Sequence, residues 1–273
     1  MITQLLSRAL GLNALDTVYR RASAQEGGST IWRVLQNKLD LRFEITDEDL
    51  DRIPKDGPVI VVANHPTGAM EGIALPALLD SVRGDVKTLA HTWFQRWPLC
   101  AERMFLVNPQ AKEGNRATNS NAMKNAAKWI RQGKMLLLFP AGEVARFQVK
   151  EGCVTDSQWK FGLAYLVKTT RATVLPIHLS GRNSVLFQLL SLMHPRMGAM
   201  LLAIELLNKR GKSLRVRIGR PIPYEEMPAA GSPVDLVAYL RRAVERLDAR
   251  GWTGRVFRRG HASPKFEQEL SRS

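Results

Sequence analysis

The sequence predicts an α/β fold in which a mixed sheet is flanked by helices. Short aliphatic segments alternate along the chain with longer amphipathic ones, which is the pattern of a sheet covered on both faces. The run Met135–Phe139 is apolar at every position, as expected of a strand buried on both sides. With 273 residues, 45% of them hydrophobic, the chain is long enough for one such domain with terminal additions.

Hydrophobic periodicity assigns the elements in order. Strands are predicted at Pro58–Ala63, Val86–Ala90, Met104–Val107, Met135–Phe139, Thr173–Leu179, Ala199–Leu207 and Leu214–Ile218. Helices are predicted at Ala117–Arg131, which Gly133 ends, and at Lys160–Thr170, Ser184–Met193 and Pro233–Arg250. Apolar faces of helices usually pack in the core, so we expect this of Val185–Leu192, with contact to lipid chains as the alternative.

The N-terminal segment Met1–Ala24 has the spacing of an amphipathic helix, with Ile2, Leu5 and Leu6 on one face. We expect it to lie in a membrane interface, the alternative being a helix packed on the protein's own core. Gly27 and Gly28 suggest a hinge. The predicted organisation is therefore a membrane-associating segment at 1–30, one domain at 31–251 and a basic tail at 252–273.

A formal net charge of +15 and a pI near 10.3 indicate a polyanionic partner. The basic residues are spread along the chain without zinc-finger or RNA-binding patterns, so we expect an anionic membrane surface and no nucleic acid, although charge alone leaves a nucleic-acid-binding protein open. Cys100 and Cys153 form no disulfide or metal pattern and are predicted to be buried thiols of a reducing, cytoplasmic compartment. No apolar stretch is long enough to span a bilayer, and no metal is predicted.

The most informative motif lies in Val59–Gly72. A buried strand ends in Asn64-His65, and a proline, a glycine and the carboxylate Glu71 follow. A neutral histidine is a good base near pH 7, and a nearby carboxylate can orient it and stabilise its cation. The pair suits deprotonation of a substrate hydroxyl, whereas the alternative is a strand-end histidine satisfied by backbone groups.

This motif resembles the His-and-acid motif of the glycerolipid acyltransferases, and is most similar to the branch of hemolysin-annotated proteins and lyso-ornithine lipid acyltransferases. The resemblance implies that His65 is the base and Glu71 its acidic partner, with Asn64 beside them. The general motif has four residues before an aspartate, whereas here Pro66–Met70 make five before a glutamate.

A second block, Leu136–Val144, resembles the family's Phe-Pro-Glu-Gly-Thr-Arg segment, and it implies substrate-binding roles for Pro140, Ala141, Gly142 and Glu143. In enzymes that accept phosphate-bearing lipids, arginines at two blocks hold the phosphate. Here those places hold Asn108-Pro109 and Val144. A carboxylate at Glu143 suits a cationic or zwitterionic headgroup, so we expect an acceptor other than glycerol 3-phosphate.

The strand Thr173–Leu179 contains Pro176, which by resemblance lines the acyl-donor pocket. Proline within an apolar strand predicts an edge strand or a bulge. His178, in the same strand, is expected to be structural.

The resemblance implies a lysolipid O-acyltransferase on the cytoplasmic face of the membrane. The donor would be an acyl thioester of acyl carrier protein or coenzyme A, used as a co-substrate without a further cofactor, and the acceptor a lysolipid such as lyso-ornithine lipid. Two alternatives remain, a lysophosphatidic acid acyltransferase and a non-catalytic lipid-binding protein on the same fold.

Overall fold

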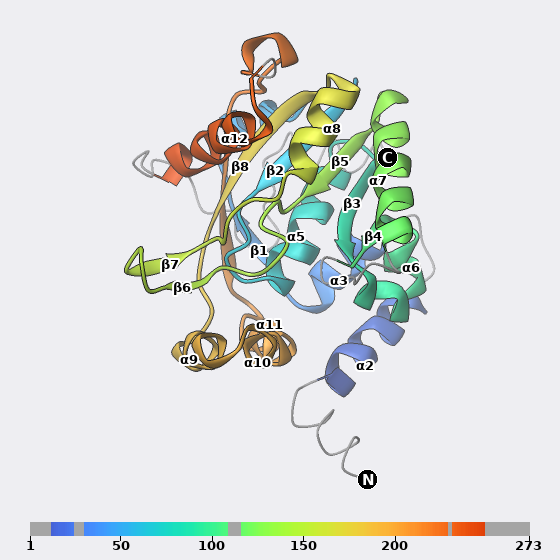
Figure 1. Ribbon diagram of the computed structural model, residues 1–273. Coiled ribbons are helices and arrows are strands. Elements are labelled where there is room, and N and C mark those ends of the chain that lie inside the picture. Colours follow the sequence, from blue (N-terminus) through green and yellow to red (C-terminus); the bar gives the residue numbers. More distant parts are fainter. Residues whose placement is uncertain (1–11, 25–29, 109–115, 229–230, 249–273) are drawn as a thin grey trace.

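A computed structural model describes residues 12–24, 30–108, 116–228 and 231–248 (Figure 1). The start of the predicted N-terminal helix, most of the predicted hinge, Pro109 and the predicted tail at 252–273 lie outside these ranges.

Seven strands form the central sheet of the described residues, in the order β1-β9-β8-β2-β5-β3-β4. They are β1 (Arg42–Glu44), β2 (Val59–Ala63), β3 (Val86–His91), β4 (Met104–Val107), β5 (Met135–Leu138), β8 (Thr173–Ser180) and β9 (Ser213–Ile218). β8 and β9 are antiparallel and the other neighbours are parallel, so the predicted mixed sheet is confirmed. Since β2 runs parallel to both β5 and β8, the carboxyl ends of these three strands meet at one edge.

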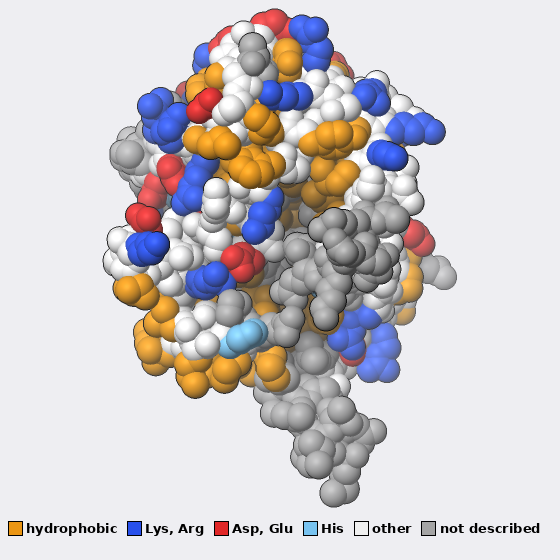
Figure 2. All heavy atoms as spheres, viewed as in Figure 1, with side chains coloured by type: hydrophobic (Ala, Val, Ile, Leu, Met, Phe, Trp, Pro, Cys, Tyr) orange, Lys and Arg blue, Asp and Glu red, His pale blue; other side chains and the backbone are white. Residues whose placement is uncertain are grey.

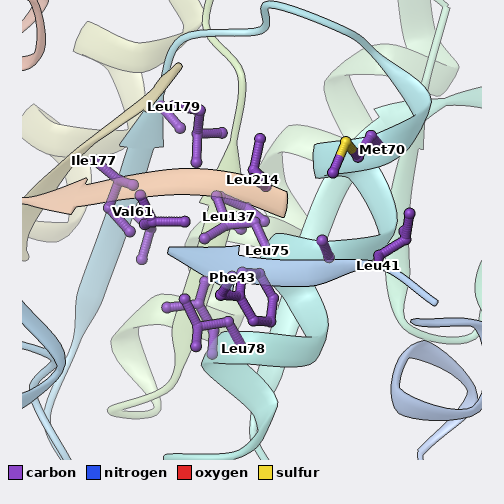
Figure 3. Close-up of a cluster of buried hydrophobic side chains, with 14 of the residues drawn as sticks. Leu41, Phe43, Val61, Met70, Leu75, Leu78, Leu137, Ile177, Leu179 and Leu214 are labelled. Carbon is purple, nitrogen blue, oxygen red and sulfur yellow. The ribbon is translucent and has the colours of Figure 1, made fainter. Parts of the chain in front are cut away.

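Helices cover both faces of the sheet (Figure 1). On one face lie α2 (Leu12–Ser23), α4 (Asp47–Asp51), α5 (Ala69–Asp80) and α11 (Leu202–Leu207), and on the other α7 (Arg116–Arg131), α8 (Gly162–Thr170) and α12 (Pro233–Asp248). The unbroken apolar run of β2 serves both layers, because Val61 packs in the first core and Ile60 in the second. Figure 3 shows the first core, where Val61 and Leu137 of the sheet lie near Leu75 of α5.

Shorter elements complete the described chain. A third cluster of buried side chains joins α2 and α3 (Ile31–Lys38) to α6 (Pro98–Ala101), beside the 3-10 helix η1 (Thr92–Arg96). The hairpin β6 (Arg146–Gln148) and β7 (Cys153–Thr155) lies next to α9 (Val185–Met193), which packs on α10 (Pro195–Met200). A second 3-10 helix, η3 (Tyr224–Glu226), precedes α12. Cys100 is buried, but Cys153 is exposed, so the prediction of two buried thiols is wrong for Cys153.

The strand predicted at Ala199–Leu207 is wrong, since these residues form the end of α10 and all of α11. Ala203 and Leu206, three residues apart, face the core, and Glu205 pairs with Lys209 at helical spacing. A short, nearly continuous apolar run does not distinguish a strand from a buried helix, which explains the error.

The strand with Pro176 is not at an edge, because β8 lies between β9 and β2. Its pairing with the chain after β9 is interrupted, since the Pro176 carbonyl accepts from the N–H of Gly219 and Val174 pairs with Ile222. The chain advances three residues from Gly219 to Ile222 but only two from Val174 to Pro176. This extra residue makes a β-bulge, and the missing N–H of the proline lies at that bulge. The predicted bulge is present and the edge position is wrong.

Helix α2 packs on the protein itself along its described length. Leu15 and Ala22 are buried, and Val18 packs against the same clusters. The Tyr19 hydroxyl accepts from the N–H of Leu99 at 3.1 Å, and Asp16 accepts from Trp97 Nε1 at 2.9 Å. For residues 12–23 the helix therefore follows the alternative of packing on the core.

Candidate active site

Asn64 and His65 follow β2 directly, at the edge where the parallel strands end. The Asn64 amide donates to the carbonyl of Leu179 at 2.8 Å and accepts from its N–H at 2.7 Å, which joins β2 to β8. The His65 N–H donates to Asp156 at 3.0 Å, and its carbonyl accepts from the N–H of Ala145 at 2.8 Å. Two loops thus fix the backbone of His65, whereas Asn64, expected beside a substrate, uses its polar atoms within the sheet.

Glu71 lies in the first turn of α5 and folds back over the preceding turn. Its Oε1 accepts from the N–H groups of Thr67 and Gly68, each at 2.6 Å, and its Oε2 accepts from the Thr67 hydroxyl. The same Oε1 lies 3.2 Å from Nδ1 of His65. Gly68 has a φ of 85°, a left-handed conformation that glycine adopts without strain. The extra residue and the longer glutamate side chain therefore bring the carboxylate to the imidazole.

Burial and hydrogen bonding together set the charge of this pair. Glu71 is 0% exposed, and burial raises its pKa. The close contact with His65 and the hydrogen bonds from Thr67 and Gly68 outweigh burial, so the pKa of Glu71 lies below its ordinary value. The amino end of α5 adds favourable dipoles. Glu71 is therefore an anion at neutral pH, suited to stabilise an imidazolium.

The imidazole of His65 is held from two sides. Its ring stacks on Phe139 with centroids 4.1 Å apart and an interplanar angle of 21°. Nδ1 is buried, and its contact with Glu71 lacks the alignment of a full hydrogen bond. Catalytic contacts of this kind often align only when substrate binds, and at 3.2 Å this one needs only a small adjustment to become a hydrogen bond. With Nδ1 directed at Glu71, Nε2 is the nitrogen that can take a proton from a substrate.

The loop after β5 lies against the His65 turn. Val144 contacts Gly68, where an added Cβ would come within 2.6 Å of Val144 Cγ2. Gly142 is left-handed, with φ 71°, and its N–H donates to the carbonyl of Phe139 at 3.0 Å. The N–H groups of Glu143 and Val144 have no hydrogen-bond partner in the described part of the chain. The free donors of this loop are thus next to Gly142 rather than on it.

The other predicted substrate-binding residues have structural surroundings. The Pro140 carbonyl accepts from the N–H of Lys160 at 2.8 Å, and Ala141 is fully buried in the second core. Glu143 pairs with Arg146 at 3.0 Å, so its carboxylate already faces a cation. Pro176 is buried in the sheet against Gly219, where an added Cβ would lie 2.8 Å from its Cγ.

The family model described as "Acyltransferase" matches residues 40–250, which is most of the chain. The chain belongs to this acyltransferase family. The predicted membership of the glycerolipid acyltransferase superfamily is confirmed.

Two curated relatives are similar to this acyltransferase along most of their length. A lyso-glycine lipid O-acyltransferase of Bacteroides thetaiotaomicron is 29% identical over 84% of each chain. One of the same name from Phocaeicola vulgatus is 28% identical over 84% of this chain and 82% of its own. The crystal structure of the 1-acyl-sn-glycerophosphate acyltransferase PlsC of Thermotoga maritima matches at 17% identity, with a TM-score of 0.49 over 92% of this chain and 98% of its own.

The site of this acyltransferase includes residues that sequence reasoning missed. Asp156 accepts hydrogen bonds from the backbone N–H of His65 and from Trp159 Nε1, the latter at 3.0 Å. Burial raises the pKa of its carboxyl group, and the hydrogen bonds from His65 and Trp159 only partly offset this rise. Thr67 supplies two of the bonds to Glu71. Asp156 follows β7 without a motif that would single it out, whereas Thr67 lies within the histidine motif itself.

No group of three or more His, Cys, Asp or Glu residues in the described ranges is arranged to hold a metal ion. Likewise, within those ranges no helix of the acyltransferase is both long and apolar enough to cross a membrane. His178 contacts Asp248 of α12 at 3.7 Å rather than a residue of the site.

Proposed function

We propose that this acyltransferase moves an acyl chain from a thioester of coenzyme A or acyl carrier protein to the hydroxyl of a lysolipid with an amino-acid headgroup. The observation that carries the proposal is the 3.2 Å contact between His65 Nδ1 and the buried, ionised Glu71. A base held in this way needs no nucleophile on the protein, because the acceptor brings its own hydroxyl.

The reaction follows from this geometry. His65 Nε2 takes the proton of the acceptor hydroxyl as its oxygen attacks the thioester carbonyl carbon, and Glu71 stabilises the imidazolium. The tetrahedral oxyanion collapses, the carbon–sulfur bond breaks, and the leaving thiolate receives the proton from His65. The N–H groups of Glu143 and Val144 are our candidates to stabilise the oxyanion, because they lie unpaired on the loop that contacts the His65 turn.

The amino-acid headgroup is supported by what stands where phosphate-binding arginines would be. Asn108 exchanges two hydrogen bonds of 2.7 Å with the side chain of Asn119, and Val144 packs on Gly68. Both curated relatives are named for lyso-glycine lipid. Glu143 is already paired with Arg146, which weakens the argument for a cationic headgroup such as ornithine and favours the glycine lipid within this class.

We further propose that the enzyme works at the anionic, cytoplasmic face of a membrane, where a lysolipid and a soluble thioester can meet. The net charge of +15 supports this. Since α2 packs on the core, removing only residues 1–11 tests the proposed N-terminal membrane contact without disturbing that packing. Truncated protein that binds anionic vesicles as strongly as the full chain would dismiss this contact.

The test is acyl transfer from acyl-coenzyme A and acyl carrier protein to lyso-glycine lipid, lyso-ornithine lipid and lysophosphatidic acid. We expect the amino-acid lipids to be preferred and His65→Ala to lose about 10²–10⁴-fold in turnover, the usual contribution of a general base. His178→Ala is the matched control, because this histidine belongs to the same sheet and contacts Asp248. Near wild-type turnover of His65→Ala would remove His65 from the mechanism, and a clear preference for lysophosphatidic acid would overturn the proposed acceptor.

A further inference from the structure

Helices α9 and α10 carry an apolar surface that is exposed in the described part of the chain. We call this surface the α9–α10 face. Val185 is 74% and Met193 73% exposed, and the remaining exposed members are Leu186, Leu189, Leu192, Met197 and Met200. Figure 2 shows apolar side chains gathered along the lower edge of the molecule, where Figure 1 places the two helices side by side. The expectation that Val185–Leu192 packs in the core is therefore wrong for most of its apolar residues.

The α9–α10 face belongs to a firmly packed unit. Phe187 and Ser191 lie on the inner side of α9, and Gly198 of α10 approaches so closely that an added Cβ would collide with the Ser191 hydroxyl. Gln188 accepts from the N–H of Phe147 at 2.9 Å, which ties α9 to β6. The outer side chains are thus displayed by a fixed support.

A buried polar cluster joins this unit to the turn that holds Glu71. Ser184, which caps α9, donates to Glu205, and Glu205 pairs with Lys209 at 2.7 Å. Lys209 donates to Asn183 at 2.8 Å, and Asn183 donates to the carbonyl of Thr67 at 3.1 Å. Leu202 of α11 also lies against Gly68. Because the links from Glu205 through Lys209 and Asn183 to Thr67 are buried and hydrogen-bonded, the α9–α10 face has a fixed position relative to His65 and Glu71.

Charge indicates which kind of partner fits. The sequence from Ser157 to Ile204 contains no aspartate or glutamate, so the helices that carry the face bring no negative charge, and the exposed Arg182 lies just before them. An exposed apolar surface on helices without acidic residues, with an arginine just before them, suits the anionic interface of a bilayer, where apolar side chains enter the acyl-chain region and arginine meets headgroups.

We propose that the α9–α10 face docks on an anionic lipid bilayer and holds the His65–Glu71 site at its surface. This inference rests on the proposed function, since a lysolipid acceptor resides in a bilayer. It also gives the folded domain a membrane contact of its own, in addition to the one proposed for the N-terminal segment. A second copy of the chain is the competing occupant, because two apolar faces could cover each other.

The experiment uses the full chain and sedimentation with vesicles of phosphatidylglycerol and phosphatidylcholine. The test variant replaces three outward residues, Leu186→Gln, Leu189→Gln and Met193→Gln. Val234→Gln is the control, because Val234 is an exposed apolar residue of α12, on a different part of the molecule in Figure 1. We expect the partition coefficient of the triple variant to fall about tenfold or more, from the loss of apolar area entering the bilayer, and that of the control to change less than about twofold.

The outcomes separate this proposal from the proposed function. With a short-chain acceptor dissolved in detergent, the triple variant should keep its turnover, because none of its changes touches His65 or Glu71. Undiminished vesicle binding by the triple variant would overturn the docking surface even if acyl transfer is intact. Loss of vesicle binding without any measurable acyl transfer by the wild type would support the surface and reject the function. Wild-type protein that ignores vesicles, but dimerises in a way that the triple variant abolishes, would assign the face to a second copy.

Discussion

Replacing Glu71 with glutamine removes the charge next to His65 while keeping every hydrogen bond of the side chain available. Both backbone N–H groups, from Thr67 and Gly68, donate to one oxygen, Oε1, which a glutamine retains. The Thr67 hydroxyl, which now donates to Oε2, can rotate and accept from the new amide. The substitution therefore tests the charge of Glu71 and leaves its capping role in place.

The expected loss can be worked from the 3.2 Å separation of His65 Nδ1 and Glu71 Oε1. A unit charge pair at this distance attracts by about 1 kcal/mol in water and about 5 kcal/mol at an effective dielectric constant near 20. Glu71 is fully buried whereas the His65 side chain is 17% exposed, so we expect a value between these limits. Turnover should fall about 10²–10³-fold, which corresponds to about 2.7–4 kcal/mol of lost transition-state stabilisation.

Steady-state acyl transfer and thermal denaturation measure the two effects separately. Glu226→Gln is the control, since that carboxylate belongs to η3, pairs with Arg220 and has no part in the proposed site. Glu71→Ala should behave differently from Glu71→Gln, because it leaves three donors unpaired in the turn, at about 1–3 kcal/mol each, and should unfold the protein or nearly so. Turnover of Glu71→Gln within threefold of the wild type, in a protein of normal stability, would refute a role for the charge.

Three further predictions concern the same turn and the loop against it. Because folding lowers the pKa of Glu71, the stability that its ionised form contributes is present above its ordinary pKa of about 4.5 and is lost as pH falls. The difference in free energy of unfolding between the wild type and Glu71→Gln, measured with urea, should therefore shrink from pH 7 to pH 3. A difference that stays constant would contradict this. Gly68→Ala should lower the free energy of unfolding by about 1–3 kcal/mol more than Gly57→Ala, because both glycines have positive φ but only a Cβ at Gly68 would collide with Val144. Equal melting temperatures of the two variants would contradict this. Ala141→Glu should unfold more readily than Ala141→Gln, by about 3 kcal/mol, because it buries an unpaired charge, and equal stability would show that position 141 opens to solvent.

The fold class and the two loops of the site could be predicted because they depend on local signals. Apolar runs that stop at His65 and at Pro140 mark strand ends, and the ends of parallel strands meet at one edge. Asp156 could not be found in this way, since its bond to the N–H of His65 joins residues that are 91 positions apart. A carboxylate in a loop gives no sign in the sequence of the backbone group that it will hold.

Two of the wrong predictions have a common physical origin. The run Ala199–Leu207 and the helix Ser184–Met193 are both rich in apolar residues, and apolar content predicts burial without giving the partner. In the fold, α11 buries one side against α5. Among the described elements α9 packs mainly on α10 and β6, and its outer side is exposed. Whether an apolar helix is covered depends on the neighbouring elements, which periodicity does not specify.

The departures from the family's phosphate-binding pattern are part of the packing of the two loops. Val144 stands where an arginine would be expected, and its side chain rests on Gly68, beside the bond from Ala145 to His65. An arginine there would have to leave this contact, and the loop that fixes His65 would lose a support. Val144→Arg alone should therefore weaken the enzyme rather than convert it to a phosphate-bearing acceptor. Under the proposed function, acceptor choice is therefore coupled to the placement of His65. We expect a change of acceptor to require Gly68, Val144 and the loop between Pro140 and Ala145 to change together.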